Sequence, residues 1–553
     1  MADQAREPLT KKAKVDAKTS VLHPDLLQSS AAARAAVQAA YATTKPYPHY
    51  QIPALCTREH MNKVHHECIT HLEGNFKETD LFKLYQTIDL GNLKTSDKIA
   101  KHLPALLELR DALYGKEFRE YITSITGCPP LTDKVDCAAN VYMQGCHLLP
   151  HDDVIGTRCV SYVIYLSDPD DDWTAADGGS LELYPSMASN DRVPDLVPTA
   201  FALPTYNTMA LFTVIPGVSF HSVQEVYAEK PRLSIQGWFH QAVAPAGVDA
   251  ATQEQLSVLR QHVSPFDELP MDSIVQNPQL TSDDLAFLRA FVNPIYLTMR
   301  TIGDIQSSFR SSGSLQLHDF LKSDLADAIA TATHGADDAA QLGSGQVPQY
   351  TAGYGEDWDP RGPVHLQRYL AYVGEGDKSS GASAGQLLGH VKDKLVASPP
   401  FQKFIWLLTG FLPTGARSQV RRFRAGLDYT LAHEQTLPTE TLLDLVLCFA
   451  NCRDADAKEA WSSGDVGGFE CYQSAEEDGL GDVAKGLQED DDDDDALVTV
   501  HAQHNTLNLV LHDENTMKFV KFVSVRAPGS RWDVSVEYTI AQVELDETEA
   551  DKE

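Results

Sequence analysis

Residues 232–239 read Arg-Leu-Ser-Ile-Gln-Gly-Trp-Phe, and polar and apolar side chains largely alternate along them. Successive side chains of a β-strand point to opposite faces, so Arg232 and Ser234 share one face and Leu233 and Ile235 share the other. An apolar face that packs against helices and a polar face that points inward are typical of a barrel strand. The polar inner face predicts a hydrated or ligand-filled interior.

The surrounding chain supplies the other strands of such a barrel. Five short runs before residue 226 are rich in β-branched and aromatic residues and are separated by turn residues. This spacing predicts an all-β sandwich or barrel, and three stretches before it, at 24–41, 58–72 and 96–125, predict packing helices. The five expected strands are Cys137–Met143, Val160–Leu166, Gly179–Tyr184, Met209–Ile215 and Ser219–Val226.

The length of 553 residues allows more than one domain. Residues 246–390 favour a helical connection, because helical patterns there surround a stretch rich in Gly, Ala, Ser and Asp that is typical of a flexible insert. A second β-rich region follows at 391–545. The run of acidic residues at 489–495 interrupts it and predicts a solvated loop.

The second β-region repeats features of the first. Asn207–Leu211, Gly178–Tyr184 and Arg232–Ile235 have counterparts in Asn505–Leu509, Gly467–Tyr472 and Arg531–Val536. The repeat predicts one fold used twice.

The candidate metal ligands of the first copy are absent from the second. The first copy has His151-x-Asp153 where the second has His433-x-Gln435, and the position of His221 falls near Val520 or Lys521. Glutamine poorly replaces an anionic ligand, and neither valine nor a protonated lysine binds iron(II). The second copy is therefore expected to have lost its metal.

His151, Asp153 and His221 form the ligand set of a mononuclear non-haem iron(II) oxygenase, which leaves three positions on the metal open. Arg232 provides a cation for the far carboxylate of 2-oxoglutarate, and Tyr165 is a candidate hydroxyl donor to it. Two alternatives stay open at this level. A lone histidine is more often structural, and Arg232 could form a surface salt bridge.

This constellation resembles the iron(II)- and 2-oxoglutarate-dependent prolyl hydroxylases. A closer resemblance is to the two-domain branch that hydroxylates a proline of a small-subunit ribosomal protein at the decoding centre, and it covers about 25–330 and 390–540. The match to the two-domain branch rests on Arg232–His240 and Phe519–Val523. The match to the prolyl hydroxylases in general rests on Tyr142, His151, Asp153, Arg158, Cys159, Val160, Tyr165, Leu166, Gly178, Gly179, His221 and Arg232.

The resemblance implies an α+β, mostly β fold of two tandem double-stranded β-helix (jelly-roll) domains with flanking helices. The catalytic copy lies at 23–245 and the second is degenerate. It implies Fe(II) and O2 as reactants at the metal, 2-oxoglutarate as cosubstrate and ascorbate as reductant. The implied catalytic residues are His151, Asp153, His221 and Arg232, of which the first three bind the metal. The implied 2-oxoglutarate residues are Tyr142, Tyr165, Arg232 and Ser234.

The implied reaction is hydroxylation of a prolyl residue, at C3, in that ribosomal protein, with an effect on translation. Two alternative functions remain. The first is an oxygenase of the same fold with another substrate, and the second is a bicupin-like binding scaffold without catalysis.

Composition narrows the partners. With 45 Lys and Arg against 78 Asp and Glu, the net charge is −33, which disfavours direct nucleic-acid binding but would attract a basic protein. No run is long and apolar enough for a membrane span. Residues 1–22 predict a disordered tail whose lysines at 11, 12 and 14 could be a nuclear signal, so nucleus and cytoplasm are expected.

Overall fold

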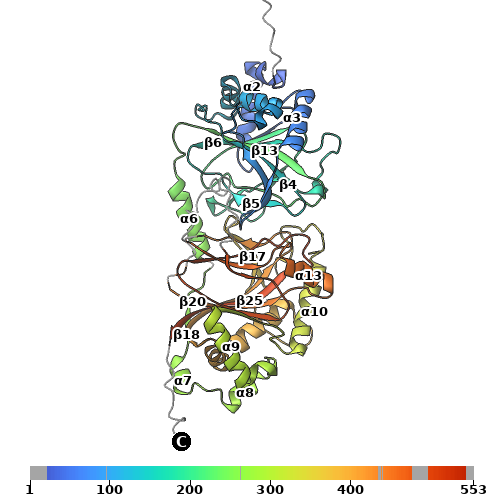
Figure 1. Ribbon diagram of the computed structural model, residues 1–553. Coiled ribbons are helices and arrows are strands. Elements are labelled where there is room, and N and C mark those ends of the chain that lie inside the picture. Colours follow the sequence, from blue (N-terminus) through green and yellow to red (C-terminus); the bar gives the residue numbers. More distant parts are fainter. Residues whose placement is uncertain are drawn as a thin grey trace, which may run out of the picture.

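The computed structural model describes residues 21–542 apart from 95, 262, 356, 434–437, 439 and 476–495. The chain forms two barrel-like β-structures stacked along one axis, each with helices on its outer side (Figure 1). This confirms the expected mostly-β fold with two tandem barrels. The predicted tail, except for its last two residues, and the acidic loop at 489–495 lie outside the described residues.

The first barrel is one 11-stranded sheet that curls on itself. Strand β2 (Asn75–Glu78) pairs only with β3, away from the main path. The path runs in the order β1 (His49–Ile52), β11 (Met209–Thr213), β6 (Arg158–Tyr165), β13 (Arg232–His240), β4 (Cys137–Tyr142), β3 (Phe82–Asp89), β5 (His147–His151), β12 (His221–Val223), β7 (Leu181–Leu183) and β10 (Ala200–Ala202).

Helices cover the outer face of this barrel. Leu233, Ile235 and Phe239 of β13 are buried in one core with residues of these helices, so the predicted parity of the strand is confirmed. The helices are α1 (Pro24–Leu27), α2 (Ala31–Thr43), α3 (Arg58–His71), α4 (Pro104–Leu113) and α5 (Lys116–Thr126). Among the described residues, no helix has the length and apolar character to cross a membrane.

The second barrel is a 12-stranded sheet in which β16 (Trp358–Arg361) and β14 (Asp267–Glu268) pair away from the main path. Its strand order matches that of the first barrel strand for strand. The path runs in the order β15 (Ser314–Leu317), β23 (Thr506–His512), β20 (Leu442–Phe449), β25 (Arg531–Gln542), β18 (Phe411–Phe423), β17 (Gln367–Tyr372), β19 (Tyr429–Thr430), β24 (Thr516–Val520), β21 (Glu470–Ser474) and β22 (Ala496–Val500).

One pair of asparagines shows how closely the copies agree. Asn207 and Asn505 both adopt positive φ, at 61° and 49°. The side chain of each bonds both backbone groups of one residue, Cys56 in the first copy and Leu321 in the second. Asparagine adopts positive φ more readily than most residues. The same asparagine conformation with the same pair of hydrogen bonds therefore occurs in both copies. The predicted repeat is confirmed.

The expected start of the second domain at residue 391 is wrong. Strand β15 pairs with β23, and β17 pairs with both β18 and β19. Both strands fall within 246–390, the predicted connection, and long-range pairing makes them part of the sheet. That part of the chain and the second domain contribute the helices α6 (Val248–Gln261), α7 (Met271–Gln276), α8 (Ser282–Leu288), α9 (Met299–Ser312), α10 (Ser323–Ala339), α11 (Ala384–His390), α12 (Pro399–Thr409) and α13 (Ala455–Ser463).

The two barrels contact each other through corresponding strands. The β5 side of the first barrel faces the β19 and β24 side of the second, where Leu149, Tyr429 and Phe522 form an apolar cluster. Lys521 of the second barrel forms an ion pair with Glu78 of the first at 3.1 Å. Helix α6 runs beside this junction (Figure 1). The junction is therefore a packed interface and not a loose linker.

Glu225 makes this interface sensitive to pH. Burial raises the pKa of its carboxyl group to about 7, although hydrogen bonds from the Ser524 hydroxyl and the Val525 amide act in the opposite direction. The folded protein therefore keeps a proton that the unfolded chain releases near its ordinary pKa of 4.5. Stability falls as the pH rises between these two values, by about 3 kcal/mol in total.

We expect Glu225→Gln to flatten the dependence of unfolding free energy on pH between about pH 4.5 and pH 7, with the largest stabilisation above pH 7. Urea denaturation at several pH values measures it. Glu229→Gln, at an exposed carboxyl in the next turn of chain, is the matched control and should follow the wild type. A Glu225→Gln curve parallel to the wild-type curve would contradict the assignment.

Candidate active site

The two candidate histidine ligands lie opposite each other on adjacent strands. His151 ends β5 and His221 begins β12, and the two are register partners in this antiparallel pair. Their ring centroids are 4.3 Å apart. Each Nδ1 lies 2.9 Å from a backbone carbonyl, that of Leu149 or Ser219, so Nδ1 carries the proton and donates it. This fixes the tautomer that leaves Nε2 free to bind a metal.

Asp153 completes the cluster just beyond the end of β5. Its backbone has φ of 61°, which turns the carboxylate back toward the histidines. Its oxygens lie 3.5 Å from Nε2 of His151 and 3.4 Å from Nε2 of His221. Burial alone would raise the pKa of Asp153, but the two adjacent histidines hold it well below its usual range.

The donor set fits iron(II). One ligand atom from each of the three residues can be chosen so that all lie within 4.8 Å of one another. Two neutral imidazoles and one carboxylate on a single face are the arrangement that suits non-haem iron(II) and leaves its other positions open. Within the described ranges, this is the one cluster of His, Cys, Asp and Glu with such geometry.

Asp152, the middle residue of the motif, fixes the second histidine relative to the first. Its backbone carbonyl accepts a hydrogen bond from the Ser219 hydroxyl at 3.1 Å, and its carboxylate lies 3.3 Å from the Gly217 amide. The turn at 152–154 is thus tied to the loop that leads into His221. The sequence assigned no role to Asp152, because an aspartate in a loop gives no local signal.

Arg232 lies fully buried at the other side of the interior. Its Nε donates to the Gly179 carbonyl at 2.7 Å, and Nη1 donates to the Ser234 hydroxyl at 3.3 Å. The guanidinium lies over the rings of Tyr142 and Tyr165, 4.9 and 5.2 Å from their centroids. The alternative of a surface salt bridge is excluded, because this side chain has no exposed surface.

Gly179 makes this approach possible. It has φ of 67°, and a Cβ at this position would lie 2.8 Å from Cδ of Arg232. Any other residue would push the arginine away from the carbonyl that orients it. Gly179 therefore contributes to the site through backbone geometry.

Several polar atoms in this interior have no hydrogen-bond partner among the residues that the structure describes. They include Nη2 of Arg232, the hydroxyls of Tyr142 and Tyr165, and one oxygen of Asp153. Buried polar groups are normally paired, so such a set is typical of a ligand site. Burial raises the pKa of both phenols, which therefore stay protonated and can donate. One guanidinium nitrogen and two phenols suit a carboxylate.

A second group of side chains lies beside the metal cluster. Arg158 stacks on Trp238, with its guanidinium carbon 3.4 Å from the ring centroid, and its Nη1 lies 3.9 Å from Asp153. Asp136 forms an ion pair with Arg158, with 3.6 Å between the Asp136 carboxylate and Nε of Arg158. Nη1 of Arg158 and the indole nitrogen have no hydrogen-bond partner in the described part of the chain. Arg158 belongs to the residues of the sequence resemblance, which implied no role for it.

A cavity of about 190 Å³ opens next to the metal cluster, at the free edges of β1 and β10. Leu183 and Phe212 line it, and the Phe212 ring lies 4.5 Å from that of His221. Apolar space therefore lies on the far side of the Phe212 ring that contacts His221.

The second barrel places a lysine where the first has His221. In both copies an arginine donates to the carbonyl of the second glycine of a Gly-Gly pair, Gly179 or Gly468. Four residues later, Leu183 pairs with His221 and Tyr472 pairs with Lys518. The predicted position, Val520 or Lys521, is therefore wrong by two or three residues. Gln435 lies outside the described residues.

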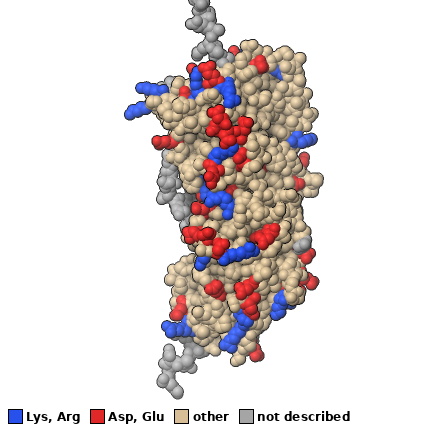
Figure 2. Space-filling model, turned by 90° about the vertical axis from the view of Figure 1, so that its right-hand side faces the viewer, with Lys and Arg blue, Asp and Glu red and all other residues tan. Residues whose placement is uncertain are grey.

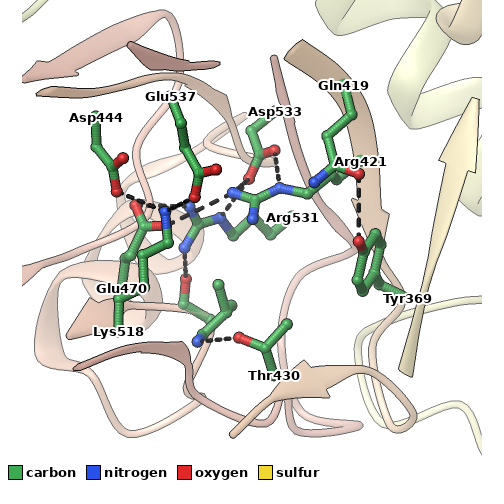
Figure 3. A network of polar contacts seen from close by, with 12 residues as sticks. Tyr369, Gln419, Arg421, Thr430, Asp444, Glu470, Lys518, Arg531, Asp533 and Glu537 are labelled. Carbon is green, nitrogen blue, oxygen red and sulfur yellow. Dashed lines mark hydrogen bonds and ion pairs between the residues drawn. The ribbon is translucent and has the colours of Figure 1, made fainter. Parts of the chain in front are cut away.

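The interior of the second barrel is filled by its own charges (Figure 3). Lys518 pairs with Asp444 at 2.7 Å and with Glu537. Asp533 replaces Ser234 in the register and pairs with Arg531 at 3.1 Å, in the place where a bound carboxylate would lie. A protonated amine cannot bind a metal cation, and an arginine already paired does not need a ligand. The second copy therefore cannot repeat the chemistry of the first.

Both the fold and the first site define a 2-oxoglutarate- and iron(II)-dependent oxygenase. A family model described as 2OG-Fe(II) oxygenase superfamily matches residues 137–240. A second, described as Oxoglutarate and iron-dependent oxygenase degradation C-term, matches residues 283–547. The first match contains every predicted site residue.

Similar proteins narrow the class further. The chain is 38% identical to Prolyl 3,4-dihydroxylase OGFOD1 of Ostreococcus tauri, over 89% of this chain and 95% of that protein. It is 28% identical to Prolyl 3-hydroxylase OGFOD1 of Xenopus laevis, over 87% of this chain and 83% of that protein. The chain belongs to the OGFOD1 family of 2-oxoglutarate-dependent prolyl hydroxylases.

Proposed function

We propose that His151, Asp153 and His221 hold iron(II), and that Arg232 with Tyr142 and Tyr165 binds the far carboxylate of 2-oxoglutarate. The observation that carries this proposal is the set of buried, unpartnered donors facing a cluster of metal-ligating atoms. Ser234 supports the site indirectly, because its hydroxyl accepts from Arg232 and fixes the guanidinium.

Iron(II) and 2-oxoglutarate, when bound, supply the oxidation of a C–H bond by dioxygen. The residues of the chain bind, orient and exclude water. The backbone carbonyls behind the two histidines hold their tautomers, and the phenols keep their protons over the working pH range. The buried interior limits side reactions with solvent.

We further propose that the substrate is a prolyl residue of a small-subunit ribosomal protein at the decoding centre, hydroxylated at C3. Arg158 lies beside the metal cluster and stacks on Trp238, and its Nη1 has no hydrogen-bond partner among the described residues. It can therefore donate to a peptide carbonyl while the indole contacts an apolar ring. The net charge of −33 would attract a basic protein. Positive and negative side chains are interspersed on the face in Figure 2, without an extended positive area.

The test is an incubation of the purified chain with Fe(II), 2-oxoglutarate, air and peptides from the decoding-centre proteins of the small subunit. We expect one peptide to gain the mass of one or two oxygen atoms on a proline, with matching release of succinate. Amino-acid analysis then distinguishes 3-hydroxyproline from 4-hydroxyproline. A peptide with that proline replaced by alanine is the control.

Two results would count against the proposal in different ways. Succinate release without oxidation of any of these peptides would retain the oxygenase site but reject the ribosomal substrate. The protein could also bind metal and 2-oxoglutarate but release no succinate with any peptide. That result would reject the proposal that 2-oxoglutarate bound at this site is turned over.

A further inference from the structure

The metal-bearing strand β12 has a second face that points away from the iron site. His221 points into the barrel, and the next residue, Ser222, points out toward the second domain. The Ser222 hydroxyl donates to the Glu182 carboxylate at 2.6 Å, and Ser222 and Glu182 are register partners on β12 and β7. Both side chains are buried, although they lie on the outside of the barrel. The second domain covers them.

Glu182 collects hydroxyl groups from both domains. It accepts from Ser222, from Tyr184 at 3.0 Å, and from Tyr350, which belongs to the second domain. The three donors fix the orientation of this buried carboxylate. Losing one of them would leave a Glu182 oxygen without one of its hydrogen bonds, which costs free energy in a buried position. Tyr350 is the donor that comes from outside the catalytic barrel.

The second domain holds Tyr350 firmly. Nη1 of Arg424 donates to the backbone carbonyls of Tyr350 and Ala352, at 2.8 Å each. Arg424 has no exposed surface and forms a two-point pair with Asp428, at 2.7 and 2.9 Å. The guanidinium of Arg368 lies 5.6 Å from the Tyr350 ring centroid. The hydroxyl of Tyr350 is therefore presented from a fixed position.

A second contact reaches the same strand from its other end. Glu225 follows β12 closely and accepts from the Ser524 hydroxyl and, at 2.8 Å, from the Val525 amide, both in the second domain. Strand β12 has only three residues, with a register irregularity between His221 and Val223 on the β5 side. A strand this short has few hydrogen bonds of its own to fix the angle of His221.

We infer that Tyr350 is a positioning residue for the metal site, and that the second barrel braces the strand that carries His221. The path runs from the Arg424–Asp428 pair through Tyr350 and Glu182 to Ser222, the neighbour of His221. The interior of the second barrel is filled by its own charged side chains. Its outer face, through Tyr350, influences the position of His221 in the first barrel. This role does not depend on which prolyl protein is the substrate.

The test compares Tyr350→Phe with the full-length wild type, using Co(II) as the metal probe under anaerobic conditions. We expect Co(II) affinity to fall by about tenfold, as for outer hydrogen bonds around a metal ligand. We also expect the Co(II) absorption spectrum with 2-oxoglutarate to change, because that spectrum reports ligand geometry. The thermal midpoint without metal should stay close to that of the wild type.

Tyr354→Phe is the matched control. Tyr354 lies in the same segment, its ring is 5.2 Å from the Arg424 guanidinium, and its hydroxyl has no hydrogen-bond partner in the described ranges. This variant should keep wild-type affinity and spectrum. Wild-type values for Tyr350→Phe would overturn the inference. An equal loss in both variants, with a lower thermal midpoint, would also overturn it by showing a general loosening.

Discussion

Asp153→Ala is expected to abolish turnover and to weaken metal binding by at least about 100-fold, more than the loss of an outer hydrogen bond would. Asp153 is the one anionic ligand of the cluster and touches both histidine nitrogens. Alanine leaves two neutral imidazoles, which bind iron(II) weakly without a carboxylate. The protein itself should remain folded, because the change removes a buried charge and leaves both strands paired.

Titration with Mn(II) or Co(II) measures the affinity, and succinate release measures turnover. Asp191→Ala, at an exposed carboxylate of the same domain, is the control and should match the wild type in both. A thermal midpoint near the wild-type value shows that the variant is folded. Unchanged turnover in Asp153→Ala would mean that the metal is held by other residues.

The first copy could be predicted well because its signals are local. The alternation at 232–239 placed Arg232 inward and Leu233 outward, and the structure has both orientations. His151 and Asp153 are only two residues apart, and the chain turns at Asp153 just after β5. Both side chains therefore reach the same metal position. These features depend on neighbouring residues, so the sequence displays them directly.

The second copy was harder because register is not a local property. The predicted counterpart of His221 differs from Lys518 by two or three residues, because the pairing of distant strands sets the register and the local sequence does not display it. Only the pairing of Tyr472 with Lys518 establishes the alignment. A lysine in a barrel interior also contradicts ordinary expectation, and two carboxylates on other strands make it possible.

The stretch around Tyr350 shows a second limit. Its glycines and serines are typical of a flexible insert, yet Ser344 and Gly345 donate backbone hydrogen bonds to Ala527 and Val525, at 2.7 and 2.8 Å. Composition reports what a segment would do alone. It does not report the buried arginine, distant in sequence, that holds Tyr350 in place.

Lys518→Met is expected to destabilise the second domain by about 3 kcal/mol, the lower part of the range for breaking a buried ion pair. Asp444 is buried and loses its cation at 2.7 Å, and Glu537 loses one of its two partners. Burial would raise the pKa of Asp444, and Lys518 and His512 keep it far below its usual range, so the variant loses the cation that contributes most to keeping this buried carboxylate ionised. The lysine side chain is 28% exposed, which moderates the loss.

Urea denaturation followed by circular dichroism measures this change, and Lys458→Met, at an exposed site on α13, is the control. The double variant Lys518→Met, Asp444→Leu should recover much of the loss, because it removes the unpaired charge and Glu537 keeps Arg417. Co(II) affinity of the first site should stay within about twofold of the wild type in folded protein, since Lys518 lies inside the second barrel and not at the interface. A Lys518→Met protein as stable as the wild type would show that the charges in Figure 3 do not hold that barrel together.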